Sequence, residues 1–170
     1  MQSQFTKQLI PDEKGRLLAT TGNGRIIKPV CFDGPTQMSI DEMMLEKCIC
    51  DENILIIFRF YTWKGCWLSI GRNQKELPKR YIELANQKKL SIVRRPSGGN
   101  AVLHSGGITY GIAWKSPPRK KLESYIKASQ WIINAFSKLG ISLSFGNQSA
   151  QPNSISCFAS STHADLIDKD

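Results

Sequence analysis

Residues 94–104 read Arg-Arg-Pro-Ser-Gly-Gly-Asn-Ala-Val-Leu-His, and the rest of the chain is interpreted outward from this stretch. It follows an apolar, strand-like run and closes with a histidine. Gly98 and Gly99 allow backbone angles closed to other residues and let a ligand approach the main chain. Arg94 and Arg95 offer forked donors that suit a carboxylate, a phosphate or a carbonyl under attack. Taken alone, the string also fits a β-hairpin with a glycine turn and exposed arginines.

The hydrophobic pattern along the chain predicts strands that interleave irregularly with helices. Strands are expected at 25–32, 54–61, 66–70, 91–94, 108–114, 141–145, 155–158 and 164–168, and helices at 35–50, 77–88 and 122–139. The strands at 91–94 and 108–114 are expected to flank a glycine hairpin. Short connections are compatible with antiparallel pairing, so the predicted fold class is α/β (α+β), with a mixed, largely antiparallel sheet backed by helices.

The N-terminal region differs in character from the rest of the chain. Residues 1–24 are polar and end in a glycine-rich stretch, which predicts a loosely attached extension ahead of one domain at 25–170. A chain of 170 residues suits one domain with a real core. It contains no run of about 18 apolar residues and no apolar region of signal-peptide type at its start. These features predict a cytoplasmic protein without a membrane partner.

Cysteine and histidine are too sparse to suggest a metal centre. The five cysteines are an odd number without a CxxC pair. In a cytosolic chain we expect free thiols, most of them small buried hydrophobic side chains. Cys48 and Cys50 lie too close together for metal-site spacing, and two histidines do not complete an obvious zinc set. The prediction is therefore that the chain has no metal site.

The formal net charge is +9, and basic residues concentrate between residues 88 and 127. Such a field favours acidic partners, which include nucleic acids, phosphorylated cofactors and acidic carrier proteins, although most Lys/Arg excess is a solvated surface. No zinc finger, RNA-binding aromatic motif or heptad-linked basic region is present. Nucleic acid is therefore not expected as a partner.

Five motifs in chain order carry a family resemblance. They are Met38-Ser-Ile-Asp-Glu42, Arg59-Phe-Tyr-Thr-Trp63, Leu68-Ser-Ile-Gly-Arg-Asn-Gln74, the string at 94–104, and Ile108-Thr-Tyr-Gly111. Together they resemble the lipoate-protein ligase A and octanoyltransferase family (biotin/lipoate A/B protein ligases), whose signature reads RRxxGGxAVxH. The resemblance covers about 25–170, with Gly111 where the family more often has serine. It implies the mixed sheet backed by helices of the biotin/lipoate ligase catalytic domain.

The resemblance also implies a site that holds a medium-length acyl chain and presents its carbonyl to a nucleophile. The implied substrate-binding residues are Arg72, Arg94, Arg95, Ser97, Gly98, Gly99, Asn100, His104 and Asp41. Main-chain N–H groups of the glycine turn would approach the carbonyl while arginines neutralise developing charge. His104 is expected beside the acyl pocket, and Asp41 is expected to orient one of the arginines. A structural histidine and a helix-surface aspartate are the alternatives.

Cys157 favours one branch of the family. In the cysteine-dependent octanoyltransferases, which this chain resembles most, a Cys-Phe pair at this place carries the acyl-enzyme. The implied reaction transfers an octanoyl or lipoyl group from an acyl carrier protein through a Cys157 thioester to a lysine of a lipoyl domain or a glycine-cleavage H protein, without a cofactor. Cys157 beside Phe158 also fits core packing. The rival activity is a lipoate-protein ligase, which needs ATP and Mg but no cysteine.

One family feature has no counterpart in this chain. Members carry a lysine in a segment resembling G-x-K-x-x-G-S-A, whereas this sequence ends at Asp170, where that turn is expected. Lys169 precedes the turn and is not assigned the role. The catalytic domain is therefore expected to be incomplete at its C-terminus, either as a fragment or as a truncated, non-catalytic relative that binds an acyl group or a carrier. Acyl length, acceptor and oligomeric state stay open.

Overall fold

The computed structural model describes residues 8–11, 17–21, 23–146, 163 and 165–168. In it the chain divides into two units, residues 1–116 and residues 117–170. The predicted division of the chain at residue 24 is a separate matter and stays a prediction.

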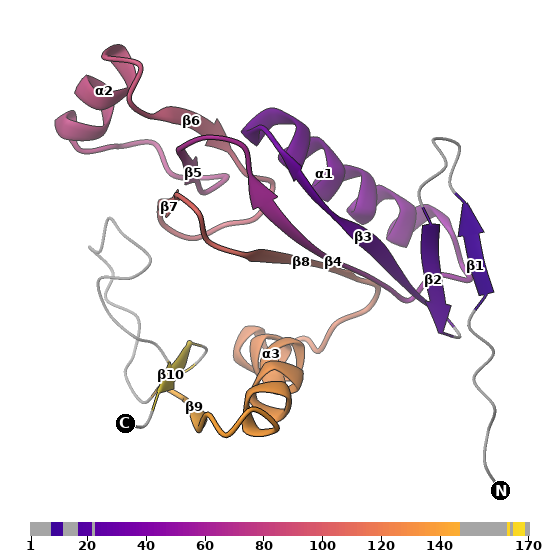
Figure 1. The fold of residues 1–170 in the computed structure, drawn as a ribbon. Coiled ribbons are helices and arrows are strands. Elements are labelled where there is room, and N and C mark those ends of the chain that lie inside the picture. Colours follow the sequence, from indigo (N-terminus) through magenta and orange to yellow (C-terminus); the bar gives the residue numbers. More distant parts are fainter. Residues whose placement is uncertain (1–7, 12–16, 22, 147–162, 164, 169–170) are drawn as a thin grey trace, which may run out of the picture. The chain divides into compact units, whose positions relative to one another are not determined.

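A five-stranded sheet forms the larger part of the first unit (Figure 1). Its order is β1 (Gln8–Pro11), β2 (Leu17–Thr21), β3 (Gly24–Phe32), β4 (Ile56–Trp63) and β8 (Thr109–Trp114). Neighbours run antiparallel except β3 and β4, which are parallel. Strands β1 and β2 pair in line with β3 and cover backbone groups that an open edge would expose. The predicted N-terminal extension at 1–24 stays a prediction.

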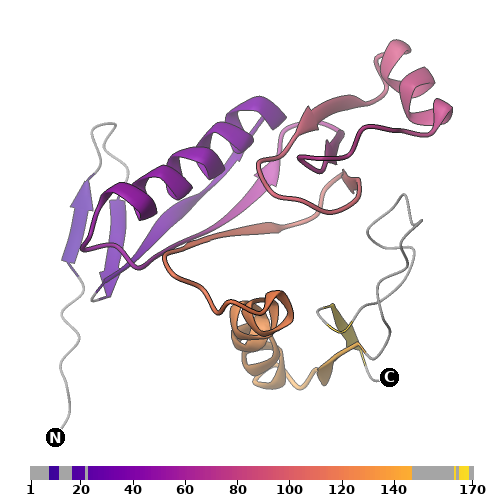
Figure 2. The same ribbon diagram turned by 180° about the vertical axis from the view of Figure 1, so that it is seen from behind.

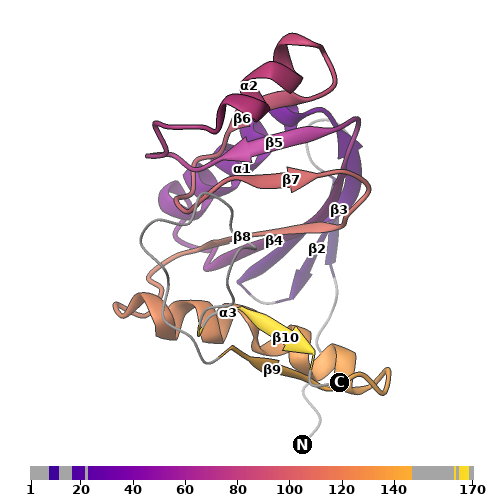
Figure 3. The same cartoon turned by 90° about the vertical axis from the view of Figure 1, so that its left-hand side faces the viewer.

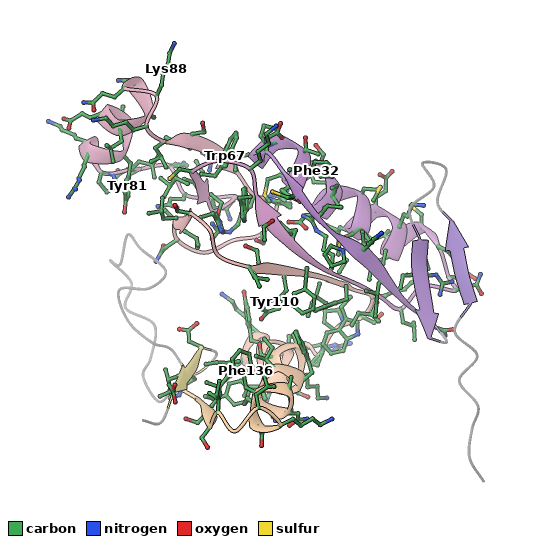
Figure 4. All side chains as sticks on the ribbon, in the orientation of Figure 1. Phe32, Trp67, Tyr81, Lys88, Tyr110 and Phe136 are labelled. Carbon is green, nitrogen blue, oxygen red and sulfur yellow. The ribbon has the colours of Figure 1, made fainter. Side chains whose placement is uncertain are left out.

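Helix α1 (Gly34–Cys50) runs along one face of this sheet (Figure 2). It begins at Asp33, whose carboxylate accepts a 2.9 Å hydrogen bond from the Thr36 N–H and so caps the first turn. Every second residue of β4 is buried, which is the pattern of a strand with one covered face. The core between helix and sheet consists of Ile27, Ile40, Met44, Cys48, Ile54, Ile57 and Ala113. On the opposite face, Tyr110 points away from α1 (Figure 4) and stacks on Phe58.

A second, three-stranded sheet carries the glycine-rich stretch (Figure 3). Its order is β6 (Ser91–Arg94), β5 (Trp67–Ile70) and β7 (Val102–His104), with β5 parallel to β6 and antiparallel to β7. The predicted glycine hairpin is wrong. The strands on either side of the glycines do not pair with each other, because each takes its backbone hydrogen bonds from β5 between them. The glycine segment therefore crosses the end of β5.

Helix α2 (Lys79–Asn86) packs against the three-stranded sheet. The apolar side chains under α2 form a second core of Leu68, Ile70, Leu90 and Ala101, with Cys66, Leu77, Tyr81, Leu84 and Ile92 packed against it.

The second unit contains α3 (Lys121–Ser137) and the antiparallel pair β9 (Leu143–Phe145) and β10 (Leu166–Asp168). The strand predicted at 155–158 lies outside the described residues.

The predicted fold class is confirmed. Five of the seven strand pairings among the described residues are antiparallel and two are parallel, which makes the sheets mixed and largely antiparallel. Helix α1 backs the larger sheet as expected. Within the described ranges, no helix has the length and apolar character needed to cross a bilayer.

The cysteines are less buried than the sequence predicts. The four described cysteines are free thiols, as expected. Only Cys48 is buried, where its Sγ lies 3.3 Å from the Ala113 carbonyl oxygen, whereas Cys31 and Cys50 are exposed. The prediction that most are core residues is therefore wrong for this part of the chain, because Cys31 and Cys50 fall on the outward faces of β3 and α1.

Candidate functional site

Two loops pack backbone to backbone at the end of β5. The loop after β5 donates the Arg72 N–H to the Ser97 carbonyl at 2.9 Å. Gly99 has φ = +94°, a conformation that favours glycine. A Cβ atom on Gly71 would overlap the Gly99 carbonyl oxygen, so Gly71 must also lack a side chain. Glycines at both positions therefore let residues 95–100, here called the glycine loop, close onto the turn at 71–74.

The Arg95 side chain holds the glycine loop through hydrogen bonds to backbone carbonyls. Its Nε and Nη2 donate to the Gly98 carbonyl at 3.2 and 2.8 Å, and Nη2 also donates to the Asn100 carbonyl at 2.7 Å. Its Nη1 donates to the carbonyl and the hydroxyl oxygen of Ser69 at 2.9 and 3.3 Å. These bonds account for all five N–H groups of the guanidinium. Arg95 therefore holds the loop in shape, and its role toward a ligand stays a prediction.

Arg94 and Arg72 are the more available cations of the predicted set. Arg94 is exposed, and its Nη1 donates to the carbonyls of Gly71 and Gln74 at 2.8 Å each. Within the described part of the chain, Nε and Nη2 of Arg94 make no hydrogen bond. Arg72 is also exposed on the neighbouring turn. The structure thus brings Arg72, Arg94, Ser97 and the glycine loop to one place, with at least one guanidinium edge facing solvent.

His104 lies beside this loop at the end of β7. Its Nε2 is 2.8 Å from the Ser69 hydroxyl, and its ring stacks on Trp63 with centroids 4.0 Å apart and planes 18° apart. Burial lowers the pKa of His104 to about 4, and the nearby Arg95 charge acts in the same direction. The imidazole is therefore neutral at pH 7. Because Arg95 donates to the Ser69 oxygen, the Ser69 hydrogen can point to Nε2, which favours a proton on Nδ1.

Thr109 completes this arrangement at the start of β8. Its hydroxyl oxygen accepts a 2.9 Å hydrogen bond from the Trp63 indole N–H and lies 3.5 Å from His104 Nδ1. With the proton on Nδ1, both lone pairs of this oxygen are engaged. In that tautomer the Thr109 hydrogen is available to a third group. A hydroxyl donor then lies next to a neutral imidazole, a combination that suits the polarisation of a carbonyl oxygen.

Asp41 does not join the glycine loop. Its Oδ1 accepts hydrogen bonds from Nε and Nη2 of Arg59 at 2.9 and 2.6 Å, beneath α1. Arg59 is fully buried and also donates to the side-chain and backbone oxygens of Gln37 at 2.6 Å each. Burial raises the pKa of the Asp41 carboxyl, and Arg59 opposes that shift. The prediction that Asp41 orients Arg72, Arg94 or Arg95 is wrong, because the helix register places it over β4.

Four residues of this neighbourhood were not predicted as site residues from sequence: Arg59, Trp63, Ser69 and Thr109. Arg59 falls at an inward position of β4, in the same alternation as Ile57 and Tyr61. A charged residue at such a position needs a buried partner, and that pattern could have identified it. Ser69 is a polar residue inside the short apolar strand β5. No comparable signal marks Thr109, whose role depends on two side chains from other strands.

Cys157 lies outside the described residues, so its predicted role stays a prediction. The same holds for the implied thioester. Across the described part of the chain, no cluster of three or more His, Cys, Asp or Glu side chains could hold a metal ion.

The family now follows from comparison with known proteins. The sequence model of the lipoyl protein ligase A/B catalytic domain matches residues 33–159, which is well over half of the chain. The chain belongs to this family. All five motifs that carry the sequence resemblance fall inside the matched range, and so does the glycine loop. The predicted membership of the lipoyl protein ligase A/B family is confirmed.

Curated relatives within the lipoyl protein ligase A/B family are octanoyltransferases. The chain is 36% identical over 121 residues to octanoyltransferase LipM of Carboxydothermus hydrogenoformans, a match that covers 69% of this chain and 45% of the relative. It is 30% identical over 142 residues to octanoyltransferase LipM of Brevibacillus brevis, which covers 76% and 51% respectively. The chain thus spans about half the length of the curated relatives it matches.

Solved structures agree on the fold. The bipartite lipoate protein ligase of Thermoplasma acidophilum, studied with its E2 lipoyl domain, matches with a TM-score of 0.58 at 22% identity. That match covers 74% of this chain and 49% of the other. The chain therefore has the fold of a lipoate ligase catalytic domain.

Proposed function

We propose that this chain serves octanoyl transfer: it receives an octanoyl group from the thioester of an acyl carrier protein and passes it to a lysine of a lipoyl-domain protein or a glycine-cleavage H protein. The observation that carries the proposal is its similarity to octanoyltransferases LipM, at 36% and 30% identity. The signature string at 94–104 lies inside the range that the family model matches, and hydrogen bonds such as that from Arg95 to the Asn100 carbonyl hold its loop together. The lipoate ligase fold by itself does not distinguish transfer from ligation.

The proposed reaction proceeds in two acyl transfers. The Cys157 thiolate attacks the octanoyl carbonyl, a new C–S bond forms, and the bond to the carrier sulfur breaks. The carrier leaves as a thiol with the proton that Cys157 gave up. The neutral ε-amine of the acceptor lysine then attacks the acyl-enzyme, a C–N bond forms, and the C–S bond to Cys157 breaks. The proton that the amine loses restores the Cys157 thiol.

The described residues have separate tasks in this scheme. Both steps place negative charge on the carbonyl oxygen, and we assign its stabilisation to hydrogen bonds from the Thr109 hydroxyl and the glycine-loop N–H groups. The open edge of Arg94 adds positive charge at the rim of the loop. His104 is neutral and already bonded to Ser69, so it shapes the site and leaves proton transfer to the sulfur and the amine.

Transfer from a thioester needs neither ATP nor a metal, because the acyl group arrives activated. The proposed setting is the cytoplasm, where thiols such as the four described ones persist in reduced form. The proposed carriers and acceptors are proteins with acidic surfaces, which the net charge of +9 would attract.

The test is the intact mass of the chain after incubation with octanoyl-acyl carrier protein. We expect one octanoyl adduct on the parent chain and none on Cys157→Ser. The matched control is Cys31→Ser, which removes an exposed thiol elsewhere and keeps the adduct. An adduct that survives Cys157→Ser would overturn the covalent route. So would the absence of an adduct from the parent chain when its cooperative unfolding shows that it is folded.

A second assay separates ligation from transfer. With octanoate or lipoate, ATP and Mg²⁺, a ligase releases pyrophosphate, and we expect this chain to release none in response to either acid. Pyrophosphate release that persists in Cys157→Ser would establish the adenylating activity instead. Tight binding of octanoyl-acyl carrier protein with neither adduct nor pyrophosphate would identify a relative that binds without turnover.

A further inference from the structure

Positive charge is concentrated in one segment of the chain. Residues 72–95 hold eight Lys and Arg against two Glu, a net charge of +6 out of the +9 of the whole sequence. The segment comprises the turn after β5, helix α2 and strand β6. We call residues 72–89, which precede β6, the α2 arm. A field this local acts on a partner over about 8–10 Å at physiological salt, so it favours one docking position over others.

The cations of the α2 arm are exposed and form no ion pair with an acidic side chain of the described residues. Exposed side chains are Arg72, Lys75, Lys79, Arg80, Lys88 and Lys89. Among the described residues, the ion pairs formed by Lys and Arg are Arg59–Asp41 and Lys127–Glu123, and neither lies in the arm. Lys88 stands at the outer end of the arm and points away from the sheets (Figure 4). The charge is therefore available to an incoming molecule.

The arm packs against its sheet through apolar side chains of α2. Tyr81 and Leu84 pack into the core around Leu68 and Leu90. The opposite side of α2 exposes Ile82, with 47% of its surface accessible. Lys79, three residues before Ile82, lies on the same side of α2, so an exposed apolar residue stands beside a cation, as at the boundary between the apolar centre and the charged rim of a protein interface.

The arm also connects directly to the glycine loop. Arg94 on β6 donates to the carbonyls of Gly71 and Gln74, so it fastens the first turn of the arm. The Arg72 N–H donates to the Ser97 carbonyl of the loop. A partner that sits on the arm therefore lies next to the loop where the acyl carbonyl is expected.

We propose that the α2 arm is the docking surface for the acidic carrier protein that delivers the acyl thioester. This inference rests on the proposed function and adds the surface that selects the donor. A protein is favoured over nucleic acid because the arm offers no exposed aromatic ring for base stacking, Tyr81 being packed against the core. The exposed Ile82 instead suits an apolar contact on a protein helix.

The experiment compares two charge reversals of equal size. Lys79→Glu/Arg80→Glu alters the arm, and Lys28→Glu/Arg119→Glu alters exposed cations outside it by the same four charges. Binding is measured with a carrier protein that bears a non-transferable octanoyl thioether, so the readout does not depend on Cys157. We expect the arm variant to bind at least about tenfold more weakly, with the salt dependence of binding reduced, while the control changes about twofold or less.

A second variant and two competitors complete the test. Ile82→Ser is expected to weaken carrier binding without changing its salt dependence, because it removes only the apolar contact. Equal losses in the arm and control variants would overturn the proposal, since they would reflect net charge alone. Displacement of the carrier by an equal concentration of RNA or duplex DNA would assign the arm to nucleic acid. If the carrier protein still binds the arm but no Cys157 adduct forms in the mass assay, the proposed chemistry fails while the docking proposal stands.

Discussion

At the scale of single residues, Gly111 is a glycine whose missing side chain leaves room for a buried ion pair. A Cβ atom there would lie 2.9 Å from Asp41 Oδ1 and 3.5 Å from Arg59 Nε. The carboxylate cannot easily move aside, because Arg59 holds it through two hydrogen bonds. We expect Gly111→Val to lower the free energy of unfolding by about 2 kcal/mol, measured by urea denaturation. The control is Gly107→Ala, which meets open space, and equal effects of the two would refute this reason.

The buried pair of Arg59 and Asp41 gives a second prediction for single residues. Removing one partner leaves a charge with reduced access to water, and we expect Arg59→Met to cost about 3–5 kcal/mol of unfolding free energy. The double variant Arg59→Met/Asp41→Leu should recover most of that loss, because no unpaired charge is left under α1. Thermal and urea unfolding of the set provide the measurement. A double variant less stable than Arg59→Met would show that the pair stabilises the fold by itself.

His104 makes stability depend on pH in a defined window. Its pKa falls from 6.5 to about 4 on folding, so the unfolded chain binds the proton more readily. Stability from this group is complete above pH 6.5 and is lost as the pH falls toward 4. With solvent screening, we expect a loss of about 1–2 kcal/mol beyond that of His104→Gln over this range. Urea titrations at about pH 7 and about pH 4.5 measure it, and parallel pH profiles would contradict the assignment.

At the scale of elements, the glycine loop depends on the fork of Arg95. A lysine keeps the charge but cannot reach Gly98, Asn100 and Ser69 together. We expect Arg95→Lys to cost about 1–2 kcal/mol and to speed hydrogen exchange of the loop amides. Arg72→Lys is the matched control, because the Arg72 side chain is exposed and its backbone N–H makes the loop contact. Unchanged exchange in Arg95→Lys would rule out the clamp.

The elements themselves follow closely from the sequence, but their partners do not. The β-branched and aromatic composition of 54–61 and the apolar stripe of α1 predicted both elements to within about two residues. Periodicity tells which face of a strand is buried and says nothing about its neighbour. The glycine segment was therefore predicted as a hairpin, although β6 and β7 each pair with β5. Strand pairing of this kind is set by contacts between residues far apart in the chain.

The candidate site shows the same division between local and non-local information. The signature string located the loop, His104 and the arginines, because glycine, arginine and histidine carry their chemistry in any context. Sequence could not tell that Arg95 would direct its donors to backbone carbonyls, since those carbonyls come from the loop's own conformation. Asp41 was assigned to the wrong arginine for a similar reason. Its partner Arg59 is set by the packing of α1 on β4.

At the scale of the whole molecule, the division into residues 1–116 and 117–170 predicts where a protease acts first. Proteases commonly cut first in exposed connections between such units, and this connection carries exposed Arg119 and Lys120 ahead of α3. Within the first unit, the basic turn after β5 is fastened by Arg94, and residues 88–89 are bonded back to α2. We therefore expect limiting trypsin to cut after Arg119 before it cuts after Lys75 or Lys88, as followed by intact mass. Arg119→Gln/Lys120→Gln should suppress this cut and leave the others unchanged. Earlier cleavage within the α2 arm would contradict both the boundary and the rigidity of the arm on which carrier docking depends.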